Sequence, residues 1–281
     1  MYQPGFAVYI TLSIMNDDHI STFTQANKAA WEASAHLHGQ GKEWDDLLLA
    51  AGKPGFSVLD DCLAATLTDL GIADCSAVQV GCNNARELLS LAAFGARPSL
   101  GIDQSAAFLA QGAQLAAAAG LSPRLLEANI YELPDSLGRH DIVLITIGVL
   151  NWMPDLQRFF QAVRGLMRPG AHLVIYETHP MLEMFNPDSA TPFVPDISYF
   201  DKTPIQIEGA ITYDGSDGGD GETGYWFVHR LGEIVTACVQ NGFRLQHLTE
   251  HPHLNREVDY AIYENQTAQI PMCYTLVAQA I

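Results

Sequence analysis

A single carboxylate follows a glycine turn at a spacing typical of folds that bind nucleotides. Val78 and Val80 indicate a short buried strand, which Gly81 ends, and the next apolar run ends in Asp103. A carboxylate about 20 positions past such a turn reaches the two hydroxyls of a ribose. The turn also presents backbone N–H groups at the start of the helix that follows. This spacing predicts a nucleoside ligand at one edge of a parallel sheet.

The turn differs from the pattern that holds a dinucleotide. That pattern needs three glycines, and here Asn83 and Ala85 occupy the second and third places. Asparagine tolerates a left-handed backbone, so Asn83 and Asn84 can still form a tight turn. Because the sequence has neither the repeated glycine nor a Gly-Lys-Ser/Thr, a pyrophosphate cradle is not expected. An ordinary turn between a strand and a helix remains the alternative to a ligand site.

Short apolar segments alternate with helical segments from residue 76 to about residue 178. This alternation is typical of a parallel β-sheet with helices on its faces. Strands are expected near residues 77–81, 98–103, 124–128, 141–147 and 172–177, with helices near residues 85–95, 105–119 and 155–167. Outside this region we expect helices at residues 21–38, 44–51 and 231–241, another that runs from a capping Ser57 to Leu70, and closing strands at residues 243–250 and 272–280.

The ordered run of segments resembles the class I methyltransferases that use S-adenosylmethionine (SAM). Their glycine motif is similar to Gln79–Ala85, and their acidic strand end is similar to Asp103. Their adenine-side segment, fourth strand and Pro-Gly-linked fifth strand resemble Ala128–Pro134, His140–Leu150 and Leu166–Glu177. The resemblance covers about residues 70–180. The chain departs from the family pattern at Gln79, Asn83, Ala85 and Asn129, the last standing where an aspartate is usual.

The resemblance implies an α/β fold with a doubly wound, seven-stranded, mostly parallel sheet. It divides the chain into a disordered extension (1–15), an N-terminal helical lid (16–71), a SAM-binding core (72–179), an inserted cap (180–226) and a C-terminal helix with closing antiparallel strands (227–281). The cap is too long for a plain connection. Its acidic, glycine-rich run at 214–222 lacks the spacing of a calcium loop, and we interpret it as a solvated turn. Tyr225, Trp226 and His229 either close the pocket or anchor the cap.

The SAM site of this family lies over the carboxyl ends of the strands, which selects the expected binding residues. Asp103 is expected to bond the ribose hydroxyls and Asn129 the adenine amine, while Gly81 lets the backbone approach the ligand. The expected cofactor-binding residues are Gly81, Asn83, Asn84, Asp103, Gln104, Asn129, Ile130, Ile147 and Gly148.

The expected catalytic residues follow the fourth strand and lie at the end of the fifth. Asn151 and Trp152 stand where the acceptor or the sulfonium would be, although Trp152 is alternatively a core aromatic. Tyr176 either faces the sulfonium, since aromatic faces attract cations, or points into the core. His179 is the first candidate for a general base, and Glu177 is the second.

The resemblance implies a transferase that moves a methyl group from SAM to a small molecule in a biosynthetic reaction. One alternative uses the same pocket: the α-amine of SAM attacks its own γ-carbon, which releases methylthioadenosine and forms azetidine-2-carboxylate. Another alternative is a SAM-binding scaffold without catalysis. The sequence does not separate these three functions, and it does not identify the acceptor.

Composition excludes several classes of partner. The formal net charge of -18 and the pI near 4.7 argue against binding to nucleic acid or to an anionic membrane surface. The apolar run from Phe6 to Met15 is too short to span a bilayer. Five cysteines without a C-x-x-C pair indicate reduced thiols in the cytoplasm, with no metal site expected. The expected partner is a small-molecule substrate, and a homodimer is left open.

Overall fold

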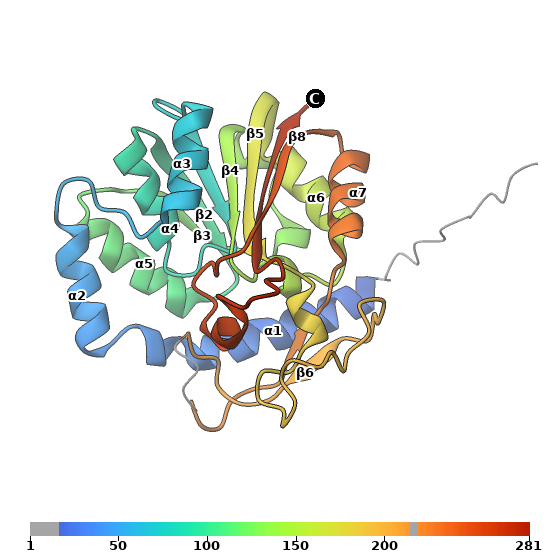
Figure 1. Ribbon diagram of the computed structural model, residues 1–281. Helices are drawn as coiled ribbons and strands as arrows, with labels where there is room; N and C mark the ends of the chain where they lie inside the picture. The colour runs from blue at the N-terminus through green and yellow to red at the C-terminus, as the bar shows by residue number, and fades with distance from the viewer. Residues whose placement is uncertain (1–16, 214–217) are drawn as a thin grey trace, which may run out of the picture.

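Seven strands form the central sheet of this computed structural model, which describes residues 17–213 and 218–281 (Figure 1). The strands are β1 (Ser76–Val80), β2 (Arg97–Asp103), β3 (Arg124–Glu127), β4 (His140–Thr146), β5 (Met167–Thr178), β8 (Phe243–His251) and β9 (Cys273–Ala280). The α-helices are α1 (Asp17–His38), α2 (Gly41–Ala51), α3 (Asp61–Leu70), α4 (Arg86–Ser90), α5 (Ala106–Ala118), α6 (Leu156–Gly165) and α7 (Leu231–Gln240). The expected extension at 1–15 lies outside the described residues. Within the described ranges, no helix has the length and apolar character that crossing a membrane requires.

The order of the strands in the sheet is β3-β2-β1-β4-β5-β9-β8. Strands β1 to β5 pair in parallel, and β9 runs antiparallel to both of its neighbours. The predicted doubly wound, seven-stranded and mostly parallel sheet is therefore confirmed. The order reverses between β1 and β4, and α/β sheets bind ligands at the carboxyl ends of strands beside such a switch point. The turn at Gly81 and the segment after Thr146 meet at this point.

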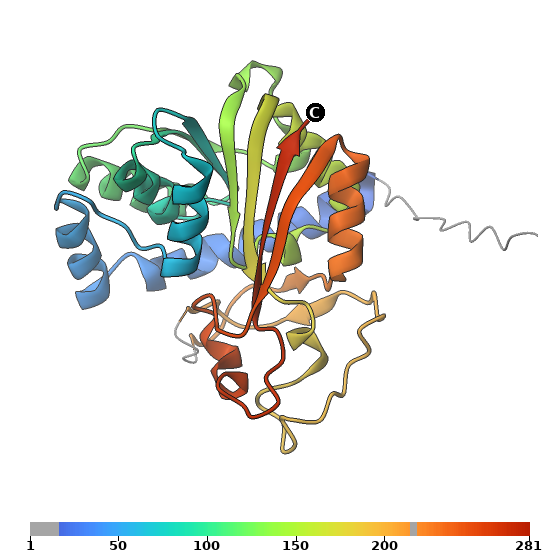
Figure 2. The same cartoon turned by 45° about the horizontal axis from the view of Figure 1, so that its top comes forward.

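Helices cover both faces of the sheet (Figure 2). In β4, alternate residues pack against different helices. In β4, Val143 and Ile145 belong to the core cluster that includes residues of α6 and α7. Their neighbours Ile142 and Leu144 belong to the cluster that includes residues of α3, α4 and α5. Because both faces are buried, the strands read as nearly continuous apolar runs. Such runs do not reveal which face a given side chain takes.

Helix α3 begins at Asp61, and the prediction that Ser57 caps it is wrong. Asp60 is the N-cap, and its Oδ1 accepts a hydrogen bond of 2.9 Å from the backbone N–H of Leu63. Ser57 instead accepts a bond of 3.2 Å from the N–H of Leu59 in the turn before the helix. Serine and aspartate are both strong N-caps, so the sequence contained two possible starts for this helix.

Segments from distant parts of the chain cover the carboxyl ends of the parallel strands (Figures 1 and 2). They are α1, the two-stranded sheet of β6 (Ile205–Ile207) and β7 (Gly224–Trp226), and the 3-10 helix η6 (Val258–Tyr263). Asn27 of α1 joins two parts of this cover. Its Nδ2 donates to the carbonyl oxygens of Trp152 at 3.2 Å and Tyr225 at 3.0 Å, and its Oδ1 accepts from the N–H of Tyr225 at 2.6 Å.

Candidate active site

The glycine turn after β1 lines a cavity of about 120 Å³. Gly81 has a φ of +63°, and a Cβ at this position would lie 2.7 Å from the Val149 side chain. Asn83 also has a left-handed backbone, with a φ of +50°, and its Oδ1 accepts a bond of 2.8 Å from the N–H of Asn84. An asparagine is one of the few residues that adopt this conformation readily. The tight turn therefore forms with a single glycine.

Asp103 ends β2 and lines the same cavity. Its Oδ2 accepts a hydrogen bond of 2.7 Å from the N–H of Asn83, and its Oδ1 accepts one of 2.9 Å from the N–H of Ser105. Burial raises the pKa of this carboxyl, although the backbone donors lower it. Each carboxylate oxygen still has a lone pair for another donor. Asp103 is thus held in a fixed position from which it can accept hydrogen bonds from a diol.

The loop after β4 has a strained backbone where it meets the ligand edge. Ile147 has a φ of +36°, which is an outlier for a β-branched residue, and Gly148 has a φ of +84°. The buried Glu177 accepts hydrogen bonds from the N–H groups of Gly148 and Leu150, the latter at 3.2 Å. Burial raises the pKa of Glu177 to about 7, against the lowering by these donors. Glu177 lines neither cavity, so the structure gives it a role in positioning the loop rather than that of a base.

A second cavity, of about 840 Å³, adjoins the first. The residues that line both cavities are Trp31, Gly81, Asn83, Ile147, Trp152 and Tyr213. The ring of Trp152 lies edge-to-face with those of Trp31 at 5.4 Å and Trp226 at 5.1 Å, measured between centroids. The junction of the two cavities therefore has an aromatic wall. Trp226 lines the second cavity, whereas the backbone of Tyr225 bonds to the Asn27 side chain and the His229 ring bonds to the carbonyl oxygen of Met153.

The second cavity carries an excess of acidic side chains. They are Glu87, Glu183, Asp188, Glu208, Glu257 and Asp259. Glu87 forms ion pairs with Arg86 at 3.2 Å and with Arg256 at 2.9 Å. These two arginines are the cations of the cavity lining. The remaining carboxyls therefore favour a neutral or cationic ligand over an anionic one.

Glu183 is a buried carboxyl in the lining of this cavity. It follows β5 in the 3-10 helix η5 (Leu182–Met184) and is 7% exposed. Burial raises its pKa to about 7, although hydrogen bonds from the Trp226 indole and the Tyr260 hydroxyl lower it. A carboxyl that titrates near neutral pH is suited to general acid–base chemistry. Sequence reasoning missed Glu183 and Glu257, since neither stands in a motif.

The prediction that Tyr176 faces the ligand is wrong. Its ring is buried in the core cluster that contains residues of α3, and its hydroxyl donates a hydrogen bond of 2.5 Å to Oδ2 of Asp60. Val174 belongs to the same cluster, while Leu173 and Ile175 belong to the cluster on the opposite face. Strand alternation therefore directs Tyr176 away from the cavities.

The prediction that His179 is a general base is also wrong. The side chain is buried and lines neither cavity. Its Nδ1 accepts a hydrogen bond of 3.1 Å from the N–H of Met181, which leaves Nε2 to donate to Glu250 at 2.9 Å. Burial lowers the pKa of the ring. With both nitrogens bonded within the protein, His179 fixes the turn that follows β5.

Three of the expected asparagines line neither cavity. Asn151 donates to the carbonyl oxygen of Phe227 at 3.1 Å, and Asn129 donates to Oγ1 of Thr24 at 3.2 Å. Asn84 is buried beside the turn, and none of the three lines a cavity. The adenine contact assigned to Asn129 is therefore not available in this arrangement. The expected cofactor-binding residues that do line a cavity are Gly81, Asn83, Asp103, Gln104, Ile130, Ile147 and Gly148.

Replacing Glu257 by glutamine should stabilise the protein at alkaline pH. Burial raises the pKa of Glu257 from 4.5 to about 7, so between these values the folded protein keeps a proton that the unfolded chain releases. The stability contributed by this group is lost as the pH rises through that window, by about 3 kcal/mol at roughly 1.4 kcal/mol per pKa unit. Urea unfolding measures the free energy of unfolding at about pH 5 and at about pH 8. This free energy should fall less between the two pH values in Glu257→Gln than in the wild type.

Buried histidines such as His179 and His229 have lowered pKa values and act in the opposite direction. Because Glu257→Gln and the wild type both contain these histidines, the difference between the two proteins does not include the histidine contribution. The exposed Glu208 provides a control, because Glu208→Gln should keep the wild-type pH dependence. Equal pH dependence in Glu257→Gln and the wild type would contradict the raised pKa.

The reversed β9, the tight turn after β1 and the acidic end of β2 define a class I, Rossmann-like methyltransferase fold. Residues 78–175 match the family described as "Methyltransferase domain". This match, over about a third of the chain, agrees with the resemblance of residues 70–180 to the class I SAM-dependent methyltransferases. A comparison with curated protein sequences finds no match.

Solved structures share this fold at low sequence identity. A SAM-dependent methyltransferase from Mesorhizobium loti has a TM-score of 0.55 and 21% identity, over 76% of this chain and 96% of that one. The methyltransferase CcbJ from Streptomyces caelestis has a TM-score of 0.57 and 14% identity, over 90% and 98%. Magnesium protoporphyrin IX methyltransferase (ChlM) from Synechocystis, with bound SAH, has a TM-score of 0.54 and 15% identity, over 94% and 100%.

SAM is the cofactor of this family, and the donor set of the first cavity fits it. Asp103 and Gln104 offer polar atoms that suit the hydroxyls of a ribose. Ile130, Val149 and Met153 offer an apolar lining that suits a flat purine. Because the second cavity continues from the first, the rest of the ligand has room beside the aromatic wall.

Proposed function

We propose that the protein transfers a methyl group from SAM to a small molecule bound in the second cavity. The observation that carries this proposal is the large cavity, with its own polar lining, that adjoins the nucleoside-type cavity. A reaction within SAM alone needs no such space. A scaffold without catalysis likewise gives no reason for a cavity of this size beside the nucleoside-type cavity.

The residues around the first cavity would bind and orient the cofactor. Asp103 accepts hydrogen bonds from the ribose hydroxyls, and Ile130 packs against the purine. When bound, SAM supplies a methyl group on a positively charged sulfur. Trp152 and its neighbouring indoles exclude water and present aromatic faces, which favour a cation by about 0.5–2 kcal/mol. Correct orientation of two reactants can lower a barrier by roughly 7–11 kcal/mol.

Glu183 would take the proton that the acceptor loses. With a pKa of about 7, its carboxylate form is present at neutral pH and can accept a proton from a bound amine or hydroxyl. The acidic lining favours methyl acceptors that are neutral or cationic. An amine is one or the other, according to its protonation. A cytoplasmic location is a prediction from the sequence, which leaves a homodimer open.

The test is to incubate the protein with SAM, first alone and then with panels of amines, phenols, thiols and carboxylic acids. Mass spectrometry of the products distinguishes methyl transfer, cyclisation of SAM and a scaffold without catalysis. We expect little change with SAM alone, and S-adenosylhomocysteine together with a methylated product when the right acceptor is present. Steady release of methylthioadenosine from SAM alone would instead favour intramolecular cyclisation. Binding of SAM without any turnover across the panels would favour a scaffold.

A further inference from the structure

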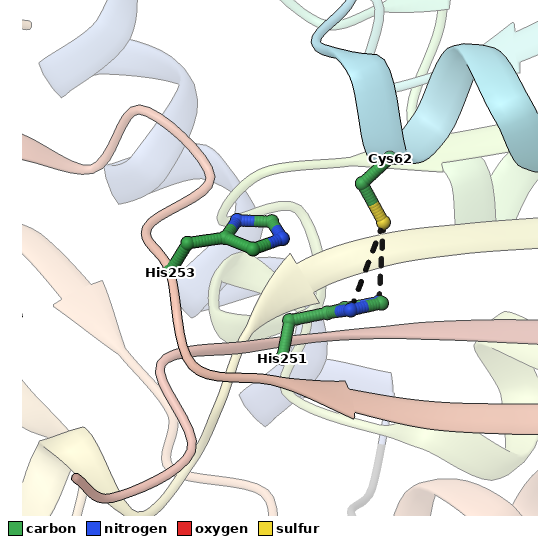
Figure 3. Close-up of side chains that lie close together, drawn as sticks. All are labelled: Cys62, His251 and His253. Atoms are coloured by element: carbon green, nitrogen blue, oxygen red, sulfur yellow. Dashed lines mark hydrogen bonds between the residues drawn. The ribbon is translucent and has the colours of Figure 1, made fainter.

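Three side chains of the types that bind metals, one cysteine and two histidines, meet on the α3 side of the sheet, outside both cavities. Figure 3 shows Cys62 of α3 above the ring of His251, with His253 beside them. The ligand atoms of these three residues all lie within 4.8 Å of one another. All three side chains are half-buried, so an ion from solvent can reach them. None of them lines either cavity of the candidate active site.

The local backbone explains why the three side chains converge. Cys62 lies in the first turn of α3, whose start is fixed by the Asp60 cap. His251 is the last residue of β8, and His253 is two residues further along. The chain bends at residues 252–253, and this bend places the His253 ring beside that of His251, with the ring centroids 5.1 Å apart. The strand end therefore offers two imidazoles together, facing the thiol from the helix.

The hydrogen bond of His253 prepares its other nitrogen for a metal. Its Nδ1 lies 3.0 Å from the carbonyl oxygen of Leu254, an acceptor, so Nδ1 carries the proton. Nε2 then carries the free lone pair. Metal-binding histidines commonly donate their second ring nitrogen to a carbonyl or carboxylate in this way, which fixes both tautomer and orientation.

The Cys62 sulfur lies against the His251 ring, 3.2 Å from Nε2 and 3.7 Å from Nδ1. The Oγ1 of Thr275 lies 2.9 Å from the same Nε2. An ion would take the place of this hydroxyl contact, and the ring would turn so that a nitrogen lone pair meets the metal. The Cys62 thiol would release its proton to solvent and bind as thiolate.

We propose that Cys62, His251 and His253 bind one zinc-class divalent ion. Two imidazoles and one thiolate form a donor set that Zn²⁺ favours, and a solvent molecule completes four-coordination at a half-buried site. The ion links the start of α3 to the end of β8, which are 189 residues apart in the sequence. It stabilises the folded protein by binding only when both elements are in place.

Cobalt provides the probe, because a thiolate bound to Co²⁺ gives a near-ultraviolet charge-transfer band that imidazole alone does not give. Full-length protein is treated with chelator, dialysed and titrated with Co²⁺ and then with Zn²⁺. We expect one cobalt per chain with the thiolate band, displacement by zinc, and a higher melting temperature with either ion. Cys62→Ser should lose the band, and His253→Ala should bind at least tenfold more weakly.

Two substitutions outside the cluster serve as matched controls, and both should bind cobalt as the wild type does. They are Cys75→Ser, at another half-buried cysteine, and His247→Ala, earlier on the same strand. Because the cluster lies outside the cavities, binding of S-adenosylhomocysteine should be equal in all variants, which also shows that each is folded. Cobalt binding without the thiolate band, or equal affinity in Cys62→Ser and Cys75→Ser, would overturn the proposal.

Discussion

Replacing Asp103 by alanine should weaken binding of S-adenosylhomocysteine about a hundredfold or more. In the proposed complex Asp103 accepts two charge-assisted hydrogen bonds from the ribose, each worth about 1.5–3 kcal/mol, and the substitution would remove both. It also removes the acceptor for the N–H groups of Asn83 and Ser105, so the turn loses part of its support. Isothermal titration calorimetry with the purified variant measures the affinity, and a thermal melt shows how much of the loss comes from unfolding.

Glu127 provides the control for this experiment. It pairs with Asp103 across β2 and β3, but its side chain bonds to Lys28 at the surface, at 2.6 Å. Glu127→Gln should keep the affinity, since an exposed ion pair contributes only about 0–1 kcal/mol to stability. If Asp103→Ala binds the nucleoside as tightly as Glu127→Gln, the ribose contact is not made by Asp103.

Replacing Glu183 by glutamine should reduce turnover by roughly a hundredfold to ten-thousandfold, the range for loss of a general base. The acceptor is the one identified by the product screen. In the wild type the rate should rise with pH through about 7, because Glu183 must lose its proton before it can accept one. That rising limb should be absent in Glu183→Gln. Affinity for S-adenosylhomocysteine should not change, since Glu183 lines only the second cavity.

Glu208→Gln is the control variant for Glu183→Gln, because Glu208 lines the same cavity. Glu208 is exposed, so its loss should leave both rate and pH profile as they are. An equal reduction in the two variants would indicate a general effect of charge on the cavity. A Glu183→Gln variant that keeps the rising limb would assign the titration to another group.

The sheet, and the meeting of Gly81 with Asp103 at one edge of it, could be predicted because local sequence determines them. Alternation of apolar strands and helices gives a parallel sheet, and the spacing from Gly81 to Asp103 follows from the length of one helix and one strand. Both residues line the first cavity as the spacing predicts. Trp152 also lies at the cavities, although its neighbour Asn151 bonds to backbone.

The direction of side chains at the end of β5 could not be predicted. Both faces of that strand are buried, so the apolar pattern around Tyr176 does not distinguish the cavity side from the α3 side. His179 lies beyond the strand, and its partner Glu250 is 71 residues further along the chain. A histidine at a strand end has the same local sequence whether it is a base or a bonded structural residue.

Groups assembled from distant segments left no local pattern either. Glu183 acquires its environment from Trp226 and Tyr260, which are far from it in sequence. The metal-type cluster joins Cys62 to His251, a separation of 189 residues. No spacing rule for metal ligands covers such a distance, and the sequence alone therefore predicted no metal.

The contacts of Asn27 determine when the ligand edge can form during folding. This one side chain bonds to residues 125 and 198 positions away. Contacts of such long sequence separation form late, because the loops that they close cost entropy before the contacts repay it. The parallel part of the sheet, whose paired residues are 65 or fewer positions apart, can therefore form while the cover of the cavities is still open. A nucleoside that binds only the finished edge should slow unfolding without accelerating the formation of the sheet.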